Sequence, residues 1–195
     1  MAKIKLTKNE LKTQRDALKR FQRYLPTLQL KKQQLQMEMR KLDLEIMKKR
    51  NEEDNARSNL ESWVSLYSDP IDLNHYISIS CLKTSRGNIA GVNIPMLDEI
   101  EFHEDIPNLY ETDAWIDQGI ETIKKLMHLR VERKIMEEQH RLLGEELRTT
   151  TQRVNLFEKV KIPEAKENIR VIRIFMGDQQ TAAVARSKIA KGKSS

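Results

Sequence analysis

The sequence contains few of the residues that interrupt helices and few of those that fill a large core. Its 195 residues include six glycines, five prolines and 5% aromatic residues, whereas charged residues make up 33%. Aromatic side chains contribute the largest buried areas, so their scarcity argues against a deep globular core. Chains rich in Glu, Lys, Arg, Leu and Gln with few breakers form long helices. The composition therefore predicts an elongated, mainly α protein.

A single cysteine, Cys81, excludes an intrachain disulfide framework and a four-thiolate metal site, and it favours a reducing compartment. We expect Cys81 to be a small buried apolar residue, because no activating neighbour is evident. No window approaches the roughly 20 apolar residues that cross a bilayer, and the first residues lack the apolar stretch of a signal peptide. These absences predict a soluble chain with no direct membrane insertion.

Motifs for catalysis are scarce as well. The Gly87 to Gly91 stretch lacks the Lys and Ser or Thr of a phosphate-binding loop. Glu137 and His140 have the helical spacing of di-iron bundles, but such a site needs a second copy and further carboxylates. A solvated helix face is therefore the favoured interpretation of this pair, and a di-iron enzyme ranks last. We predict no enzyme activity, no cofactor and no metal site.

Charge is unevenly distributed along the chain. Residues 1–50 carry 15 Lys and Arg against 5 Asp and Glu, residues 51–120 carry 3 against 14, and residues 121–195 carry 17 against 10. Both ends are therefore basic and the middle is acidic. If the ends lie together, they form a positive pole suited to an acidic partner, such as an acidic protein surface, nucleic acid or anionic lipid.

Heptad spacing predicts a long first helix that begins at a capping box formed by Thr7 and Glu10. Pro26 lies inside this helix, where it is expected to bend or kink the backbone. Pro70 is expected to end the run after residue 68. Polar residues interrupt the apolar seam at Lys32, Lys49 and Glu53, and such breaks can fix register. The candidate seam positions of this helix are Leu11, Leu18, Phe21, Leu25, Leu28, Leu35, Met39, Leu42 and Ile46.

A second long helix is predicted after a cap at Asp113. Near Pro163 its apolar pattern slips by an eleven-residue step from Val154 to Ala165, which relaxes a left-handed supercoil. Gly177 is expected either to end or to loosen this helix, and the basic tail either continues it or frays. The candidate seam positions of this second helix are Leu147, Val154, Phe157, Ile169, Ile172 and Met176.

Between the helices, residues 76–81 alternate in polarity and predict a short strand. We expect a turn at residues 86–88, a returning strand over residues 89–94 that stops before Pro95, and then an acidic loop. The predicted organisation is a helix over residues 1–68, a β-hairpin with loops over 69–112, and a helix with a basic tail over 113–195. Folded back antiparallel, the helices form a two-helix coiled coil, with Trp63 and Trp115 near one end.

Two further features are candidate partner contacts. Leu30, Met37 and Leu44 repeat every seven residues away from the main seam. This stripe is either part of a wide seam buried by the other helix or a docking site for a third element, because exposed apolar patches mark contacts. The second feature is the basic tail, whose candidate contact residues are Arg186, Lys188, Lys191 and Lys193.

Two motifs resemble the D subunit of the V/A-type rotary ATPases. The segment NIAGVNIPMLDEIE at residues 88–101 is similar to the family stretch NVMGVxVPxLE, and RVNLFE at residues 153–158, with IP at 162–163 and IR at 169–170, is similar to its RVNALE, IP and IR motif. The chain departs from the family pattern at residues 25–32, where LPTLQLKK replaces GHKLLKDK, and at residues 152–153, where QR replaces an arginine pair.

The resemblance implies a central-stalk shaft that couples ATP turnover in a hexamer of A and B subunits to H⁺ or Na⁺ movement through a membrane ring. It also implies a small stalk protein, the F subunit, on the flank and a ring-adaptor subunit at the hairpin end, in a cytoplasmic complex peripheral to the membrane. Alternatives are a prefoldin-like coiled-coil chaperone subunit and a basic coiled-coil nucleic-acid binder, although nucleic acid is not expected because no aromatic stacking platform accompanies the basic residues.

Overall fold

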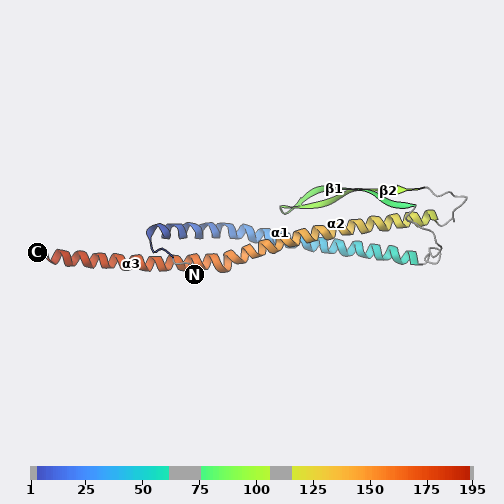
Figure 1. Cartoon of the computed structure of the whole chain (residues 1–195). Helices are drawn as coiled ribbons and strands as arrows, with labels where there is room; N and C mark the ends of the chain where they lie inside the picture. Colours follow the sequence, from blue (N-terminus) through green and yellow to red (C-terminus); the bar gives the residue numbers. More distant parts are fainter. Residues whose placement is uncertain (1–3, 62–75, 106–115, 194–195) are drawn as a thin grey trace. The chain divides into compact units, whose positions relative to one another are not determined.

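The structure, a computed structural model, describes residues 4–61, 76–105 and 116–193 (Figure 1). The helix α1 spans Lys8–Glu61, and the strands β1 and β2 span Ile77–Ile89 and Val92–Glu104. The helix α2 spans Ile116–Asn155, the π-helix η3 Leu156–Lys161, and the helix α3 Ile162–Lys193. The prediction of a mainly α protein with long N- and C-terminal helices and a small central hairpin is therefore confirmed. None of the helices in these ranges has the length and apolar character needed to cross a membrane.

Contacts divide the chain into two compact units, and each long helical run contributes to both. The first unit contains residues 1–33 and 148–195, and the second contains residues 34–147. The first unit thus pairs segments from opposite ends of the sequence. The predicted organisation divides the chain in another way, into three consecutive segments. The predicted boundaries at Pro70 and Asp113, and the two tryptophans Trp63 and Trp115, lie outside the described residues.

In the first unit, α1 begins at the predicted position, and one of the two hydrogen bonds of the expected capping box is present. The Thr7 hydroxyl oxygen accepts the backbone N–H of Glu10 at 3.3 Å. The Glu10 carboxylate does not return to Thr7; it accepts from the Gln14 amide at 2.8 Å. Leu6 packs against a cluster formed by Leu11 with Ile169 and Ile172 of α3, so the residues before the helix also contribute to its core.

The predicted slip in apolar phase near Pro163 coincides with η3. Proline has no N–H to donate and its ring crowds the carbonyl four residues earlier. A π-helix lengthens the hydrogen-bonded loop to five residues, and the N–H of Ile162 accordingly bonds the carbonyl of Phe157. The ring of Phe157, which lies within η3, packs against the ring of Phe21 on α1 with centroids 5.2 Å apart. In α1, the backbone remains helical through Pro26.

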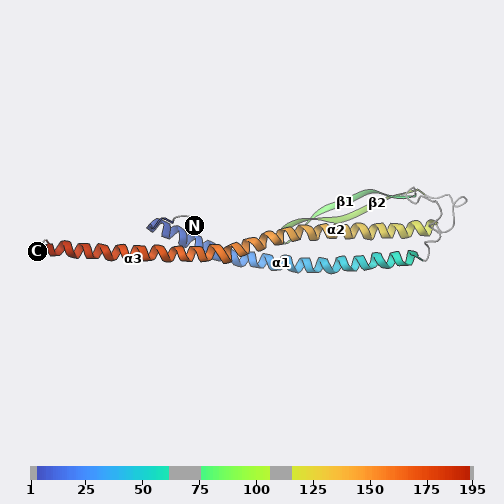
Figure 2. The ribbon, with the colours of Figure 1, turned by 60° about the horizontal axis from the view of Figure 1, so that its bottom comes forward.

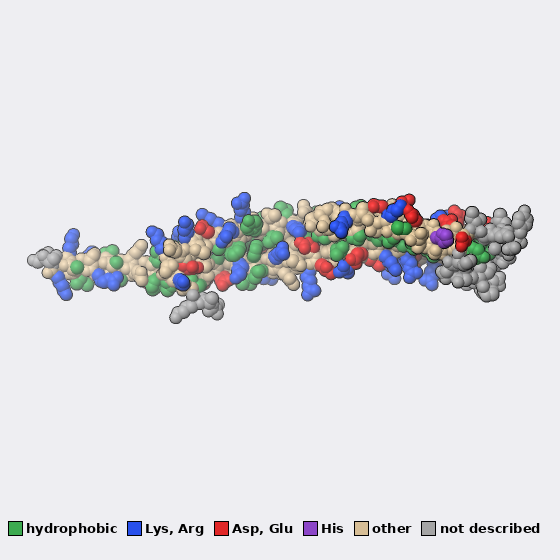
Figure 3. All heavy atoms as spheres, turned by 45° about the horizontal axis from the view of Figure 1, so that its top comes forward, with side chains coloured by type: hydrophobic (Ala, Val, Ile, Leu, Met, Phe, Trp, Pro, Cys, Tyr) green, Lys and Arg blue, Asp and Glu red, His purple; other side chains and the backbone are tan. Residues whose placement is uncertain are grey.

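The C-terminal part of α3 continues through Gly177 and remains helical to Lys193. All of residues 177–193 are exposed. Lys and Arg side chains predominate over acidic ones on this part of α3 in the face shown in Figure 3. The basic tail is therefore a helical extension of α3 rather than a frayed end.

In the second unit, β1 and β2 form a two-stranded antiparallel hairpin that lies beside α2 (Figures 1 and 2). The expected turn at residues 86–88 is wrong, because Gly87 and Asn88 pair with Ile94 and Asn93 within the ladder. The turn instead lies at Ala90 and Gly91, which have positive φ angles of 52° and 81°. Two consecutive positive φ values are typical of a two-residue hairpin turn.

The expected strand end before Pro95 is also wrong, because β2 passes through Pro95 and continues to Glu104. Proline is tolerated on edge strands, where its missing N–H need not face a neighbour, and both strands of a two-stranded sheet are edges. The carbonyl of Pro95 accepts a hydrogen bond from the Gln139 side chain of α2 at 2.6 Å. Much of the segment expected to be acidic loop therefore belongs to the strand.

Two apolar clusters join the hairpin to the helices of the second unit. Near the hairpin turn, Ile94 packs with Leu35 and Leu42 of α1 and Leu143 of α2. At the other end, Ile77 packs with residues of the first turns of α2. Most of β1 remains exposed. Cys81 is exposed too, so its expected burial is wrong, because a single-layered hairpin has only one face against the helices.

Two of the polar interruptions in the seam make ion pairs between α1 and α2. The Lys49 ammonium lies 2.9 Å from the Glu132 carboxylate, and the Arg133 guanidinium donates to Glu53 at 2.8 Å. All four side chains are 22–27% exposed. The hydrogen bond to Glu132 raises the pKa of Lys49 above its ordinary value. These pairs place an opposite charge beside polar groups that would otherwise lose water in the seam without compensation.

We expect the Lys49 and Glu132 pair to contribute to the stability of the second unit. A double-mutant cycle with Lys49→Met and Glu132→Gln, followed by urea unfolding, should give a coupling free energy of about 0.5 to 1 kcal/mol, since the pair is only partly exposed. A raised lysine pKa means that this stabilisation is complete at neutral pH and is lost as the pH rises through that pKa. The exposed pair Arg170 and Glu167 is the control, and an equal or larger coupling there would contradict this assignment.

Candidate partner-binding surfaces

The fifteen candidate seam residues all lie buried or half-buried. Burial is complete or nearly complete at Leu11, Leu35, Leu42, Val154, Ile169 and Ile172. The half-buried members are Leu18, Phe21, Leu25, Leu28, Met39, Ile46, Leu147, Phe157 and Met176. These side chains belong to the interior of the two units, so the surfaces available to partners lie elsewhere.

The second apolar stripe of α1 is exposed. Leu30, Met37 and Leu44 expose 60%, 55% and 62% of their surface, so the described parts of α2 and α3 do not bury them. Met47, which the sequence reasoning missed, is 62% exposed. It lies three residues after Leu44 and therefore on the same face of the helix, a spacing that was visible in the sequence. The stripe is thus an uncovered apolar surface along one helix.

The tail residues Arg186, Lys188, Lys191 and Lys193 are all exposed on the helical extension of α3. The last acidic residue of the sequence, Asp178, precedes these four basic residues by eight positions or more. The extension also exposes Val184 and Ile189. It therefore offers a basic surface with two isolated apolar side chains.

The residues considered for a di-iron site contact other polar side chains instead. The Glu137 carboxylate pairs with Arg133, and the His140 imidazole lies 3.0 Å from the carboxylate of Asp43 on α1. The hydrogen bonds that the Arg133 guanidinium donates to Glu53 and Glu137 raise its pKa above the ordinary value. Within the described part of the chain, no group of three or more His, Cys, Asp or Glu side chains has the proximity to hold a metal ion.

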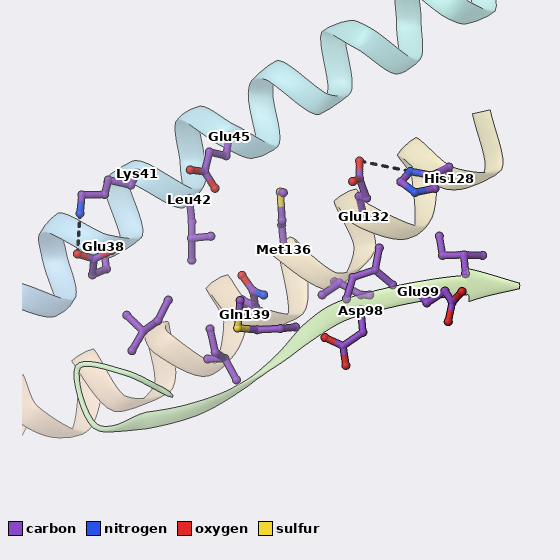
Figure 4. A pocket seen from close by; sticks show the side chains of 16 residues that line it. Glu38, Lys41, Leu42, Glu45, Asp98, Glu99, His128, Glu132, Met136 and Gln139 are labelled. Carbon is purple, nitrogen blue, oxygen red and sulfur yellow. Dashed lines mark hydrogen bonds and ion pairs between the residues drawn. The ribbon is translucent and has the colours of Figure 1, made fainter. Parts of the chain in front are cut away.

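A groove of about 470 Å³ lies in the second unit between α1, α2 and β2 (Figure 4). Leu42 extends from α1 and Met136 from α2 into the space between the elements. We refer to this space as the hairpin groove. The apolar side chains that line it include Leu42, Ile94, Leu97, Ile100, Ile135 and Met136.

Carboxylates outnumber cations around the hairpin groove. Its lining includes Glu38, Glu45, Asp98, Glu99 and Glu132, against the cation Lys41 and the imidazole of His128. The Lys41 ammonium bonds Glu38 at 2.8 Å, and the His128 imidazole lies 3.7 Å from Glu132. The groove therefore combines an apolar interior with an acidic border. The sequence showed an acidic middle segment but not this groove, because its walls come from three elements far apart in the chain.

Comparison with known proteins covers nearly the whole chain. Residues 10–192 match the sequence profile of the ATP synthase D subunit family. A V-type ATP synthase D subunit from Borreliella burgdorferi is 51% identical over 191 residues, which cover 98% of this chain and 95% of the relative. Proteins of the same name from Chlamydia caviae and Chlamydia muridarum are 33% and 34% identical, each over 98% of this chain and 94% and 96% of the relative. The chain therefore belongs to the ATP synthase D subunit family.

Proposed function

We propose that this protein is the central-stalk shaft of a V-type rotary ATPase, and that it transmits rotation between a catalytic hexamer of A and B subunits and a membrane ring that moves H⁺ or Na⁺. The observation that carries this proposal is the match over nearly the full chain to relatives named as D subunits of V-type ATP synthases. In this role the chain makes and breaks no bonds, and it acts on the cytoplasmic side as a peripheral part of the complex.

The physical properties of the chain suit a shaft. A shaft transmits torque when its helices hold one another in register, and the Leu35, Leu42 and Leu143 cluster together with the Lys49 and Glu132 pair joins α1 to α2 in the second unit. In the first unit, Leu11 packs against Ile169 and Ile172. Close packing of this kind resists deformation because interior side chains have few voids to move into.

The exposed surfaces are then assigned to partners. We assign the Leu30, Met37 and Leu44 stripe to a partner on the flank of the stalk, for which the small F subunit is the candidate. Apolar exposure on this scale along one helix face favours a protein contact. We assign the basic extension of α3 to acidic surfaces within the hexamer, since opposite charge guides association and register. The hairpin end is assigned to the ring-adaptor subunit.

The alternative functions are less well supported. A prefoldin-like chaperone is not favoured, because the chain belongs to a different family over nearly its full length. The same observation disfavours a nucleic-acid binder. The exposed basic extension of α3 remains compatible with electrostatic contact to nucleic acid, so steeply salt-dependent DNA binding by the purified complex would favour that second function.

Truncation after Met176 tests the tip assignment. Because residues 177–193 are exposed, their removal should leave the helical content measured by circular dichroism proportionate to length. It should weaken the coupling of ATP hydrolysis to rotation in the reconstituted complex. A full-length variant in which Arg186, Lys188, Lys191 and Lys193 are changed to Gln separates the effect of charge from that of length. Undiminished coupling in the truncated protein would remove the tip proposal.

Replacing Leu30, Met37 and Leu44 with Ser tests the stripe. If these side chains are buried against the F subunit, losing their apolar area should weaken binding in a pull-down titration by about tenfold or more. The matched control replaces Val171 and Ile174, which are 39% and 51% exposed on α3, with Ser. Equal affinity of both variants and the parent protein would show that the stripe does not bind this partner.

A further inference from the structure

We propose that the hairpin groove is the docking site for a basic amphipathic helix contributed by another subunit of the assembly. The proposal rests on the proposed function for the identity of the assembly, but the groove itself is a feature of the second unit alone. It is distinct from the Leu30, Met37 and Leu44 stripe, none of whose residues lines it.

The interior of the groove requires apolar anchors in its occupant. Met136 extends into the space from α2 (Figure 4), and the half-buried side chains of Leu97 and Ile100 line it from β2. Leu42 and Ile94 also line the space but are already buried in the core. A volume of about 470 Å³ accommodates a few apolar side chains and lies within the range of ordinary binding pockets. Water in such a space gains little from its walls, so burying apolar side chains there is favourable.

The border of the groove requires positive charge in that occupant. Glu45 extends from α1 toward the space, and Glu132 lies across it on α2 (Figure 4). Three border carboxylates already have a cation: Glu38 is bonded to Lys41, Glu132 to Lys49 and Glu99 to Lys83. Glu45 and Asp98 have no ion pair among the described residues. Lys or Arg side chains complement such a border. Nucleic acid and anionic lipid are repelled by it, which leaves a basic protein segment.

The backbone of β2 favours a helix over an added strand. A strand joins a sheet by bonding the free N–H and carbonyl groups of an edge. At the groove, the β2 carbonyl of Pro95 already accepts the Gln139 amide at 2.6 Å, and proline has no N–H to donate. A helix satisfies its own backbone and needs only side-chain contacts. One apolar face flanked by Lys or Arg therefore describes the occupant.

Site-specific photo-crosslinking in cells that express the tagged full chain with the other subunits of its assembly tests this proposal. A benzophenone amino acid replaces Met96, an exposed residue that lines the groove. We expect a crosslink to a segment of another subunit that is helical, apolar on one face and net positive. A second variant with the probe at Leu30 reports on the flank contact, and thus on the proposed function, independently of the groove.

A charge reversal then tests the electrostatic part of the proposal. Glu45→Lys should lower the Met96 crosslink yield about fivefold, the effect expected when one border charge changes from attractive to repulsive. Asp54→Lys reverses a charge on the same helix outside the groove and should leave the yield unchanged. A crosslink to a protein outside the ATPase would overturn the assignment of the occupant to another subunit, while the Leu30 probe would still report on the proposed function. No crosslink from Met96, or one to an acidic segment, would overturn the groove proposal whether or not Leu30 reaches its partner.

Discussion

A narrow row of apolar side chains on α1 is the interaction on which both units depend. In the first unit this row meets α3 through Leu11, Ile169 and Ile172, and in the second it meets α2 and the hairpin through Leu35, Leu42 and Leu143. The row is only one or two side chains wide, so each contact carries a large share of the burial that opposes chain entropy. The exposed surface of each helix is then left mainly to charged groups and to scattered apolar residues, some of which we assign to partners.

The polar interruptions in this row have a structural consequence. Lys49 and Glu53 stand where apolar residues are expected in the heptad pattern, and each meets an opposite charge on α2. A slide of one helix along the other by a turn would leave these charges without their partners in a partly dehydrated setting, which is costly. Polar positions in a helix seam are known to specify register in this way. For a shaft, register matters because slippage would dissipate the torque.

With the hairpin, the second unit consists of a two-stranded sheet packed against two helices rather than of a pair of helices alone. Its turn is held by apolar contacts near Leu143, and its other end by contacts near Ile116. Between these attachments, β2 and the two helices enclose the groove whose border is acidic. Two carboxylates from the acidic middle of the sequence, Asp98 and Glu99, therefore lie on β2 at the border of this groove and not in a loop.

The helices and the presence of a central hairpin were readily predicted from the sequence, whereas the position of the hairpin turn, the extent of its strands and the groove were not. Heptad spacing and the Thr7 cap are local signals that act within one helix, so the start of α1 and the candidate seam positions follow from them. The hairpin turn was misplaced because Gly87 and Asn88 have turn chemistry, while the positive φ of Ala90 breaks the usual preference for glycine or asparagine. Ala90 packs against the Leu35 cluster, so tertiary contacts outweigh local preference there. The exposure of Cys81 and the walls of the groove likewise depend on which face of the hairpin meets the helices.

Observation of single complexes shows whether this chain turns as a shaft. Cys81 is the only cysteine of the chain and is exposed on β1, so it offers a natural attachment point for an optical probe, with Cys81→Ser as the unlabelled control. The complex would be held to a surface through its A and B subunits and supplied with ATP. We expect the probe to rotate stepwise in one direction and to stop when ATP is removed. A probe that stays fixed relative to the hexamer while ATP is being hydrolysed by a coupled, intact complex would contradict this expectation.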